Sequence, residues 1–363
     1  MATRPEPAGV PGVPVDRSEV AARVRGWAPS LLRTLIALVA TAAIFSALIA
    51  ALGVNPADAL TAFWEGAAGN TFNFGQTVMI ASLLACTGLA AAIPFQARLW
   101  NVGGEGQLWF GAFAAVTLAL ILPDGMPGWL AITITVAGAT LAGAFWGFIP
   151  GILKATVNAN EVITCLMLVF IGIALGNYAI STLFPSESNQ TESVPFDRLL
   201  PNIWTGTLVT AGALLALGAV LVALTLMSGT SLGFQIRAVG LNRNAARISG
   251  MRTGRVIVLA FAIGGAFGGL AGAIAVLGIN GAVVAGFSAN FGFLGIAVAL
   301  VARLKPLWII PSALLFAALR TGSSGLQAQT GISATVGEIL VTVLVVLLLA
   351  LGVIRLRYAE AAQ

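Results

Sequence analysis

Long apolar runs, separated by short polar connections, occupy most of this 363-residue sequence. About 20 consecutive apolar residues are enough for a helix to cross the hydrocarbon core of a bilayer. Only 9% of the residues are charged, whereas a soluble domain carries about 25%. The sequence therefore predicts an all-α polytopic membrane protein with about ten transmembrane helices. The expected spans are 31–53, 75–94, 105–122, 129–152, 161–183, 203–227, 255–279, 291–304, 306–320 and 335–354.

Basic residues are divided unevenly between the two sides of these spans. With the N-terminus in the cytoplasm, sixteen of the eighteen Lys and Arg residues face inward, and only Arg198 and Arg320 face outward. Cytoplasmic loops are enriched in Lys and Arg, so both termini are expected in the cytoplasm. The expected regions are a disordered cytoplasmic tail 1–30, a membrane domain 31–354 with an external loop 184–202, and a cytoplasmic tail 355–363. The outer segment Val54–Phe74 is expected to be either a solvated loop or a landing surface for an external partner.

The longest polar, basic insert is Ser228–Arg255, which contains five arginines. Two apolar rows with spacing i, i+4, i+7 predict two short helices, each with one apolar side. Gly240 is expected to break the first helix, while Asn242 caps the second and Gly250 ends it. The rows are Leu232, Ile236 and Val239, and Leu241, Ala245 and Ile248. A basic helix pair between two spans predicts a cytoplasmic segment, 228–254, that docks on a partner at the membrane surface.

Several kinds of chemistry are excluded or disfavoured by residue content. The chain has no His, and Cys86 and Cys165 lie inside apolar runs, which favours small core residues over a disulfide or metal site. A phosphate-binding P-loop requires G-x-x-x-x-G-K-[ST], but neither of the two lysines, Lys154 and Lys305, stands in that motif. No cofactor is expected on this chain, so ATP would be bound and hydrolysed by a separate subunit. The net charge of +5 is spread over short loops and does not indicate nucleic-acid binding.

Interrupted spans indicate where a transport path could lie. Spans 291–304 and 306–320 are short, and Ile93–Gly106 contains Pro94 and three glycines. Such interruptions in corresponding places mark the central path of many transporters. Spans two to five can be matched in order with spans seven to ten, a shift of five spans. Because five is an odd number, the two sets would cross the membrane in opposite directions, which predicts an inverted repeat. The candidate pathway residues are Asn73, Asn101, Gln107, Ser288, Asn290, Phe291 and Phe293.

Each of these polar side chains has an alternative role in capping or cross-linking helices. Glu105, Glu161 and Glu338 are the carboxylates nearest to the membrane interior, and we expect them to be charges at the ends of spans. Ion-coupled carriers often keep carboxylates at the bilayer centre, so this pattern disfavours such a carrier.

Four segments resemble motifs of a known family. They match its N-x-G-x-E-G-Q and N-x-N-E-V-I motifs, its G-F-x-G-I-A-V-A-L segment and its cytoplasmic R-A-x-G-x-N-x-x-A-A-R-x-x-G segment. The segments are Asn101–Ala115, Asn158–Leu168, Gly292–Ile310 and Phe234–Met251. The chain, over residues 31 to 355, thus resembles ATP-binding-cassette (ABC) importer permeases of the branched-chain amino acid and ribose group, in forms most similar to the simple-sugar and nucleoside branch. Cys165 stands in place of the usual Thr, and Ala302–Arg303 in place of a Leu-Gly pair.

The resemblance implies a non-catalytic permease subunit in a prokaryotic cytoplasmic membrane. A second permease subunit, identical or paralogous, would complete the pore, two ABC ATPase subunits would bind ATP-Mg beneath it, and an external binding protein or lipoprotein would deliver a nucleoside or simple sugar. Segment 228–254 would be the coupling segment that contacts the ATPase. Carried over by position, the coupling residues are Arg237, Ala238, Gly240, Asn242, Ala245, Ala246 and Arg247.

Other functions remain open at the level of sequence. The chain could be an ion-coupled secondary transporter, which would transport when purified alone, or an ABC permease for branched-chain amino acids. A polytopic enzyme acting on lipid is disfavoured, because the spans lack His and a cluster of acidic residues. A neighbouring gene for a P-loop ATPase would favour the importer.

Overall fold

The computed structural model describes residues 36, 39–183, 189–288 and 290–333, and seven positions between 335 and 347. Within this part the only β pairing is two isolated bridges, Gln190 with Val284 and Asn202 with Thr210, so the prediction of an all-α protein is confirmed. Both terminal tails lie outside the described residues.

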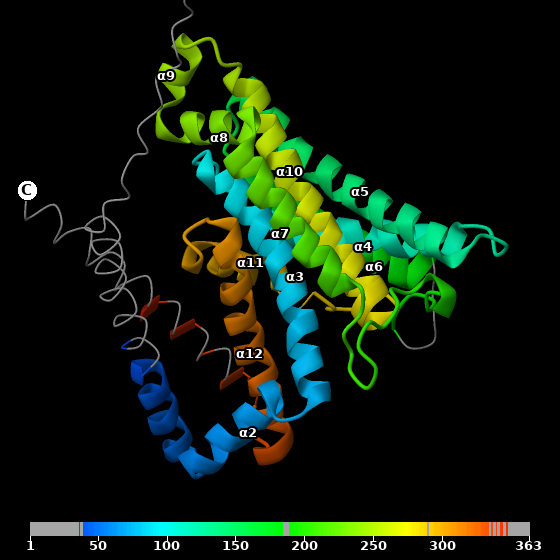
Figure 1. Cartoon of the computed structure of the whole chain (residues 1–363), viewed down its shortest axis with the longest axis vertical. Coiled ribbons are helices and arrows are strands. Elements are labelled where there is room, and N and C mark those ends of the chain that lie inside the picture. Colours follow the sequence, from blue (N-terminus) through cyan, green and yellow to red (C-terminus); the bar gives the residue numbers. More distant parts are fainter. Residues whose placement is uncertain are drawn as a thin grey trace, which may run out of the picture.

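The helices follow one another with short connections (Figure 1). Their bounds are Val39–Ala51, α2 Pro56–Ala68, α3 Thr71–Gln96, α4 Gly104–Ile121, α5 Gly128–Val157, α6 Glu161–Tyr178 with a π-helical end Ala179–Leu183, a 3-10 turn Phe196–Arg198, α7 Gly212–Gly229, α8 Ser231–Leu241, α9 Arg243–Ile248, α10 Thr253–Ile274 with a π-helical end Ala275–Asn280, α11 Phe291–Val301 and α12 Pro306–Thr330.

Seven of the described helices are long and apolar enough to cross a membrane. Val39–Ala51 and α2 provide an eighth span if they are counted as one pair, although they bend by 118°. Helix α11 is shorter, as its sequence predicted. The expected tenth span, 335–354, lies mostly outside the described residues. A multi-pass helical membrane protein is therefore supported, whereas the number ten remains a prediction.

Two expected boundaries were wrong, and a segment expected as a solvated loop is largely helical. The span expected at 203 begins at Gly212, because 202–210 forms a turn in which the Asn202 side chain donates to the carbonyl of Thr207 at 2.6 Å. The span expected to end at Arg320 continues to Thr330. Segment 54–74 is not an open loop, since Asn55 caps the helix α2, whose first residue is Pro56.

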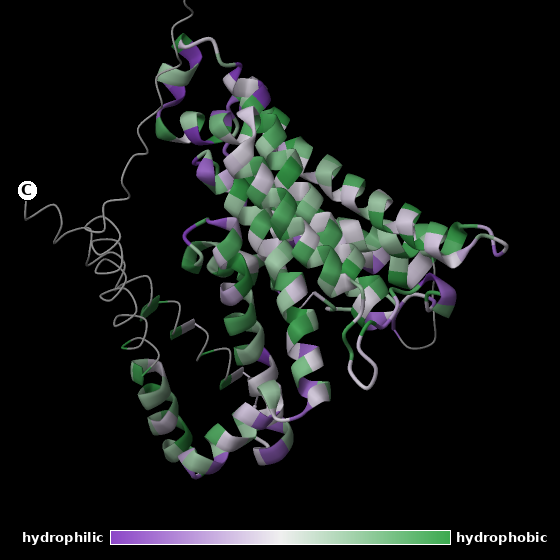
Figure 2. Cartoon of the chain, viewed as in Figure 1, coloured by the Kyte–Doolittle hydropathy of each residue, from purple (hydrophilic) through white to green (hydrophobic). Residues whose placement is uncertain are grey.

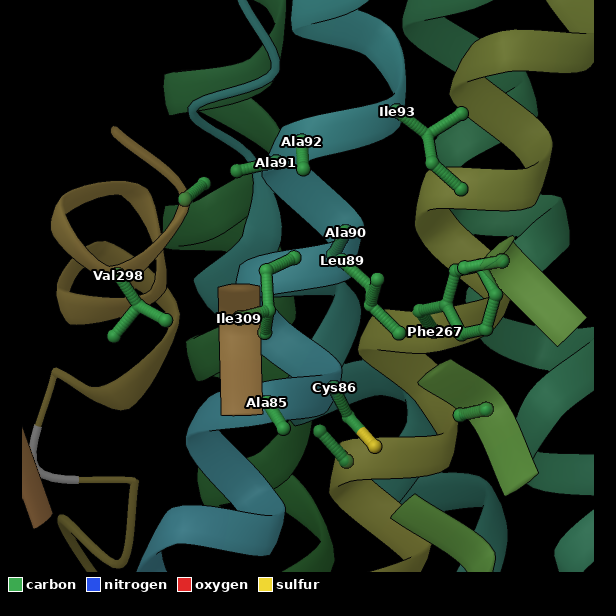
Figure 3. Packing of buried hydrophobic residues seen from close by; sticks show 14 of the residues in the cluster. Ala85, Cys86, Leu89, Ala90, Ala91, Ala92, Ile93, Phe267, Val298 and Ile309 are labelled. Carbon is green, nitrogen blue, oxygen red and sulfur yellow. The ribbon is translucent and has the colours of Figure 1, made fainter. Parts of the chain in front are cut away.

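Helix α3 lies at the centre of the main hydrophobic core. Figure 3 shows its side chains between Phe267 of α10 and Val298 and Ile309 of α11 and α12. Helices α5 and α10 approach so closely that a Cβ atom on Gly143 would collide with the backbone of Gly269. Small residues permit such close contact between membrane helices, so these glycines serve helix packing.

Large apolar side chains on α5, α6 and α7 point away from the core. Among them are Leu141, Phe145, Phe170, Leu221 and Val222. Figure 2 shows the helix bundle as mostly hydrophobic, with hydrophilic residues gathered on α8, α9 and the connecting segments. This is the pattern expected of helices whose outer faces contact lipid.

Candidate functional site

The first candidate site is the junction where the N-termini of α4 and α11 meet. A Cβ atom added to Gly292, the second residue of α11, would collide with the backbone of Glu105 in the first turn of α4. Gly268 of α10 packs against Gln107 and lies near the middle of the apolar span Thr253–Asn280. The two helix starts therefore meet near the middle of the membrane domain.

Glu105 is the centre of a buried hydrogen-bond cluster at this junction, and its side chain is only 2% exposed. One carboxylate oxygen accepts from the backbone N–H of Gly292 at 2.7 Å, and the other accepts from the Ser288 hydroxyl and from Trp109 Nε1. A buried carboxylate needs such partners, and the positive end of the α11 dipole adds to them. Glu105 thus joins α4 to α11 and to the segment before α11. It stands at the start of the span α4, as expected, but it is buried among hydrogen-bond donors, which the sequence did not predict.

A second polar cluster lies beside the first, where the irregular segment 97–103 passes α3. The Asn101 side chain donates to the carbonyl of Ala90 at 2.9 Å, and its oxygen accepts from Gln107 Nε2 at 3.1 Å. The Cys165 thiol lies 3.6 Å from the same Asn101 oxygen. Asn101 and Gln107 are both buried, so in this conformation they cross-link helices.

The structure gathers most, but not all, of the predicted pathway residues. Ser288 and Phe291 lie at the α4–α11 junction, with Asn290 and Phe293 in the same stretch of chain. Asn73 lies apart, because its side chain donates to the carbonyl of Glu65 at the turn between α2 and α3. The junction is therefore the better candidate for a transport path.

Arg320 was missed as a site residue. It lies inside the apolar helix α12, and its guanidinium lies 4.6 Å from the centre of the Phe291 ring. An ionisable residue within a membrane span is by default a candidate for function. A charge inside an apolar run was the available signal, but the residue was read as the end of a span.

The second candidate site is the helix pair α8–α9, which lies at one end of the bundle (Figure 1). The Asn242 side-chain oxygen accepts from the backbone N–H groups of Asn244 and Ala245, both at 3.0 Å. Gly250 follows α9 with φ of +84°, a conformation that glycine adopts without strain. The predicted helix pair, its cap and its stop are confirmed, although α8 ends one residue beyond Gly240.

The predicted coupling residues divide into two groups. Arg237, Gly240 and Ala246 face the chain itself: Arg237 donates to the carbonyl of Met227, Gly240 packs against the carbonyl of Gln96, and Ala246 is buried. Asn242, Ala245 and Arg247 are exposed, as is Arg243, and Ala238 is half-buried. Two large apolar side chains, Leu241 and Ile248, are 78% and 85% exposed beside these arginines.

Comparison with known proteins identifies the family. Residues 73–354 match the model described as "Branched-chain amino acid transport system / permease component". The guanosine ABC transporter permease of Bacillus subtilis is 32% identical over 87% of this chain and 92% of its own length. The glucose ABC transporter permease of Haloferax volcanii is 31% identical over 86% of both chains, and the nucleoside ABC transporter permease NupB of Lactococcus lactis is 32% identical over 80% of this chain and 83% of its own.

These matches extend over the long apolar helices, the α4–α11 junction and the α8–α9 helix pair. The chain belongs to the family of permease components of branched-chain amino acid transport systems.

Proposed function

We propose that this chain is the transmembrane subunit of an ABC importer that moves a nucleoside or a simple sugar into a prokaryotic cell. The named relatives carry guanosine, nucleosides or glucose. No P-loop is present in the sequence, so ATP-Mg is bound and hydrolysed by a partner ATPase. A second permease subunit completes the pore, and an external binding protein delivers the substrate.

The observation that carries this proposal is the exposed apolar and basic surface of α8–α9. Leu241 and Ile248 are almost free of contacts with their own chain, and Arg243 and Arg247 are exposed next to them. Exposed apolar groups ringed by charge are typical of protein interfaces. Arginines can pair with carboxylates on the ATPase. We assign the contact to Arg243 and Arg247 rather than to Arg237, whose guanidinium already binds Met227.

The packing of helices also supports alternating access through an inverted repeat. Helices α3, α4 and α5 correspond in order to α10, α11 and α12. Helix α10 packs against α4 and α5, and α3 packs in the same way against α11 and α12. Contacts α4–α5 and α11–α12 also correspond, and α4 meets α11 at their N-termini. Rocking of these halves about the junction would open the path on alternate sides, with both termini in the cytoplasm.

The coupling surface is tested by reversing its charge. In proteoliposomes containing the permease, its ATPase and the binding protein, we expect the double variant Arg243→Glu, Arg247→Glu to lower ATP-dependent uptake by about tenfold or more, because two interface charges become repulsive. The matched variant Arg243→Lys, Arg247→Lys keeps both charges and should retain most uptake. Normal uptake by the Glu variant would contradict the docking role.

The substrate is tested in the same vesicles with labelled guanosine and labelled glucose. A nucleoside is the first candidate because two of the three relatives named above carry one, and a simple sugar is the second because the glucose permease is 31% identical over a similar length. Uptake of either requires ATP and the partner ATPase. Accumulation driven by an ion gradient in vesicles that contain this chain alone would refute the importer.

A further inference from the structure

A cavity of about 560 Å³ lies between α8, the turn after α9 and the first two turns of α10. Arg252 and Arg255 stand at its side, and Gln235 of α8 adds an amide. Leu232, Val256 and Leu259 supply apolar walls. The cavity thus combines a basic part with an apolar part, and neither candidate site described above includes these two arginines.

The basic part of the cavity has no internal counter-charge. Neither the Arg252 nor the Arg255 side chain forms a hydrogen bond or ion pair with another residue of the described chain, and both are exposed. The sequence contains no Asp or Glu between Asp197 and Glu338. Both arginines also stand at the N-terminus of α10, where the positive end of the helix dipole favours an anion. The charge of the cavity therefore fits an anionic ligand.

The apolar part of the cavity reaches into a membrane span. Val256 and Leu259 belong to the apolar span Thr253–Asn280, and Leu232 follows closely after the last residue of α7, Gly229. The arginines stand where this span begins, which is the level of lipid head groups. A water-soluble partner protein does not enter the hydrocarbon region, whereas a phospholipid has both an anionic head and an apolar chain.

We propose that this cavity binds an anionic phospholipid of the leaflet that faces the coupling segment. Its phosphate lies between Arg252 and Arg255, with Gln235 as a further donor, and its acyl chain lies along the half-buried Leu232 and Leu259. Basic pockets between membrane helices are suited to anionic head groups. Because α8 forms one wall, the lipid would contact the coupling helix directly. The lipid site does not depend on the nature of the transported substrate, and only the choice of leaflet rests on the proposed orientation.

The site is tested by titrating the full-length purified chain with phosphatidylglycerol and following bound lipid by native mass spectrometry. Phosphatidylcholine and inorganic phosphate serve as the neutral and soluble probes. We expect Arg252→Gln, Arg255→Gln to weaken phosphatidylglycerol binding about 30-fold, from the contribution of two cations near the head group. The matched variant Arg243→Gln, Arg247→Gln removes the same charge outside the cavity and should bind like the wild type.

A second variant tests the apolar part without changing charge. Leu259→Trp should fill the cavity beside the acyl chain and lower lipid binding, and a melting curve checks that it is folded. Equal loss of binding in the cavity and control arginine variants would overturn the proposal, because it would indicate only general attraction to a basic segment. Displacement of the lipid by millimolar inorganic phosphate would also overturn it in favour of a soluble anion, and so would equal binding of phosphatidylcholine.

Discussion

Glu105 is the residue on which most of the polar contacts at the α4–α11 junction depend. Replacing it with Ala leaves the Ser288 hydroxyl and the Gly292 N–H without their acceptor, while the Trp109 indole keeps its bond to Ser288 Oγ at 2.9 Å. Each unsatisfied buried group costs about 1–3 kcal/mol. We therefore expect Glu105→Ala to destabilise the purified chain by roughly 3 kcal/mol or more, measured by thermal unfolding in detergent.

Two further variants calibrate this measurement. Glu105→Gln keeps one acceptor oxygen and should lose less stability than Glu105→Ala. Glu192→Ala removes an exposed carboxylate and should change stability by no more than about 0.5 kcal/mol. If Glu105→Ala melted together with Glu192→Ala, the carboxylate would not hold the junction together.

Charges inside the membrane domain were the residues that sequence analysis interpreted least well. Glu105 and Arg320 both stand beside apolar runs, and a boundary charge is the ordinary interpretation of such a position. The partners that make Glu105 tolerable, Ser288 and Gly292, are more than 180 residues away in sequence. A buried charge was therefore invisible until the fold had brought α4 and α11 together.

Helix α8 is held against the end of α3 by Gly240. A Cβ atom there would collide with the carbonyl oxygen of Gln96 and come close to Ala97. Overpacking of this kind typically costs 1–3 kcal/mol or shifts the backbone. Under the proposed function, we expect Gly240→Ala to displace α8 from α3 and lower ATP-dependent uptake by about tenfold, while the ATPase still binds the exposed surface of α9.

The control for this variant is Gly218→Ala. Gly218 lies inside α7 with open space where a Cβ atom would be, so alanine should be neutral or stabilising by up to about 1 kcal/mol. Uptake by Gly240→Ala equal to that of Gly218→Ala would refute a role for the α8–α3 contact in coupling, and loss of ATPase binding would place the defect in docking instead.

Short helices with clear local signals were predicted better than the limits of long spans. The apolar spacing, the Asn242 cap and Gly250 all act within a few residues, and α8 and α9 form as expected. The end of α12 was missed although it has a local signal, because Arg320 was taken as the end of the span, whereas the helix continues to Thr330 and is capped by Gly331 with φ of +72°. Helix α2 had local signals too, in Asn55 and Pro56, but the acidic residues around them favoured a loop.

At the scale of the whole molecule, two exposed residues near opposite ends of α10 can show which way the chain is oriented in the membrane. Ile248 lies just before the start of the Thr253–Asn280 span, while the turn at Phe196 packs near its other end, where the Leu200 N–H donates to the carbonyl of Leu277. A helix of 28 residues is about 40 Å long, which exceeds the roughly 30 Å of a bilayer core. Ile248 and Phe196 must therefore face opposite sides of the membrane.

This orientation can be measured by thiol labelling, because the two native cysteines, Cys86 and Cys165, are buried and should not react. With a membrane-impermeant thiol reagent, we expect Phe196→Cys to be labelled on intact cells and Ile248→Cys only after the membrane is opened. Phe196 and Ile248 are 91% and 85% exposed, so a difference in labelling reflects the side of the membrane. The unaltered chain serves as the unlabelled control. Labelling of Ile248→Cys on intact cells would place α8–α9 outside, where an ATP-driven subunit could not reach them, and the importer proposal would fail with it.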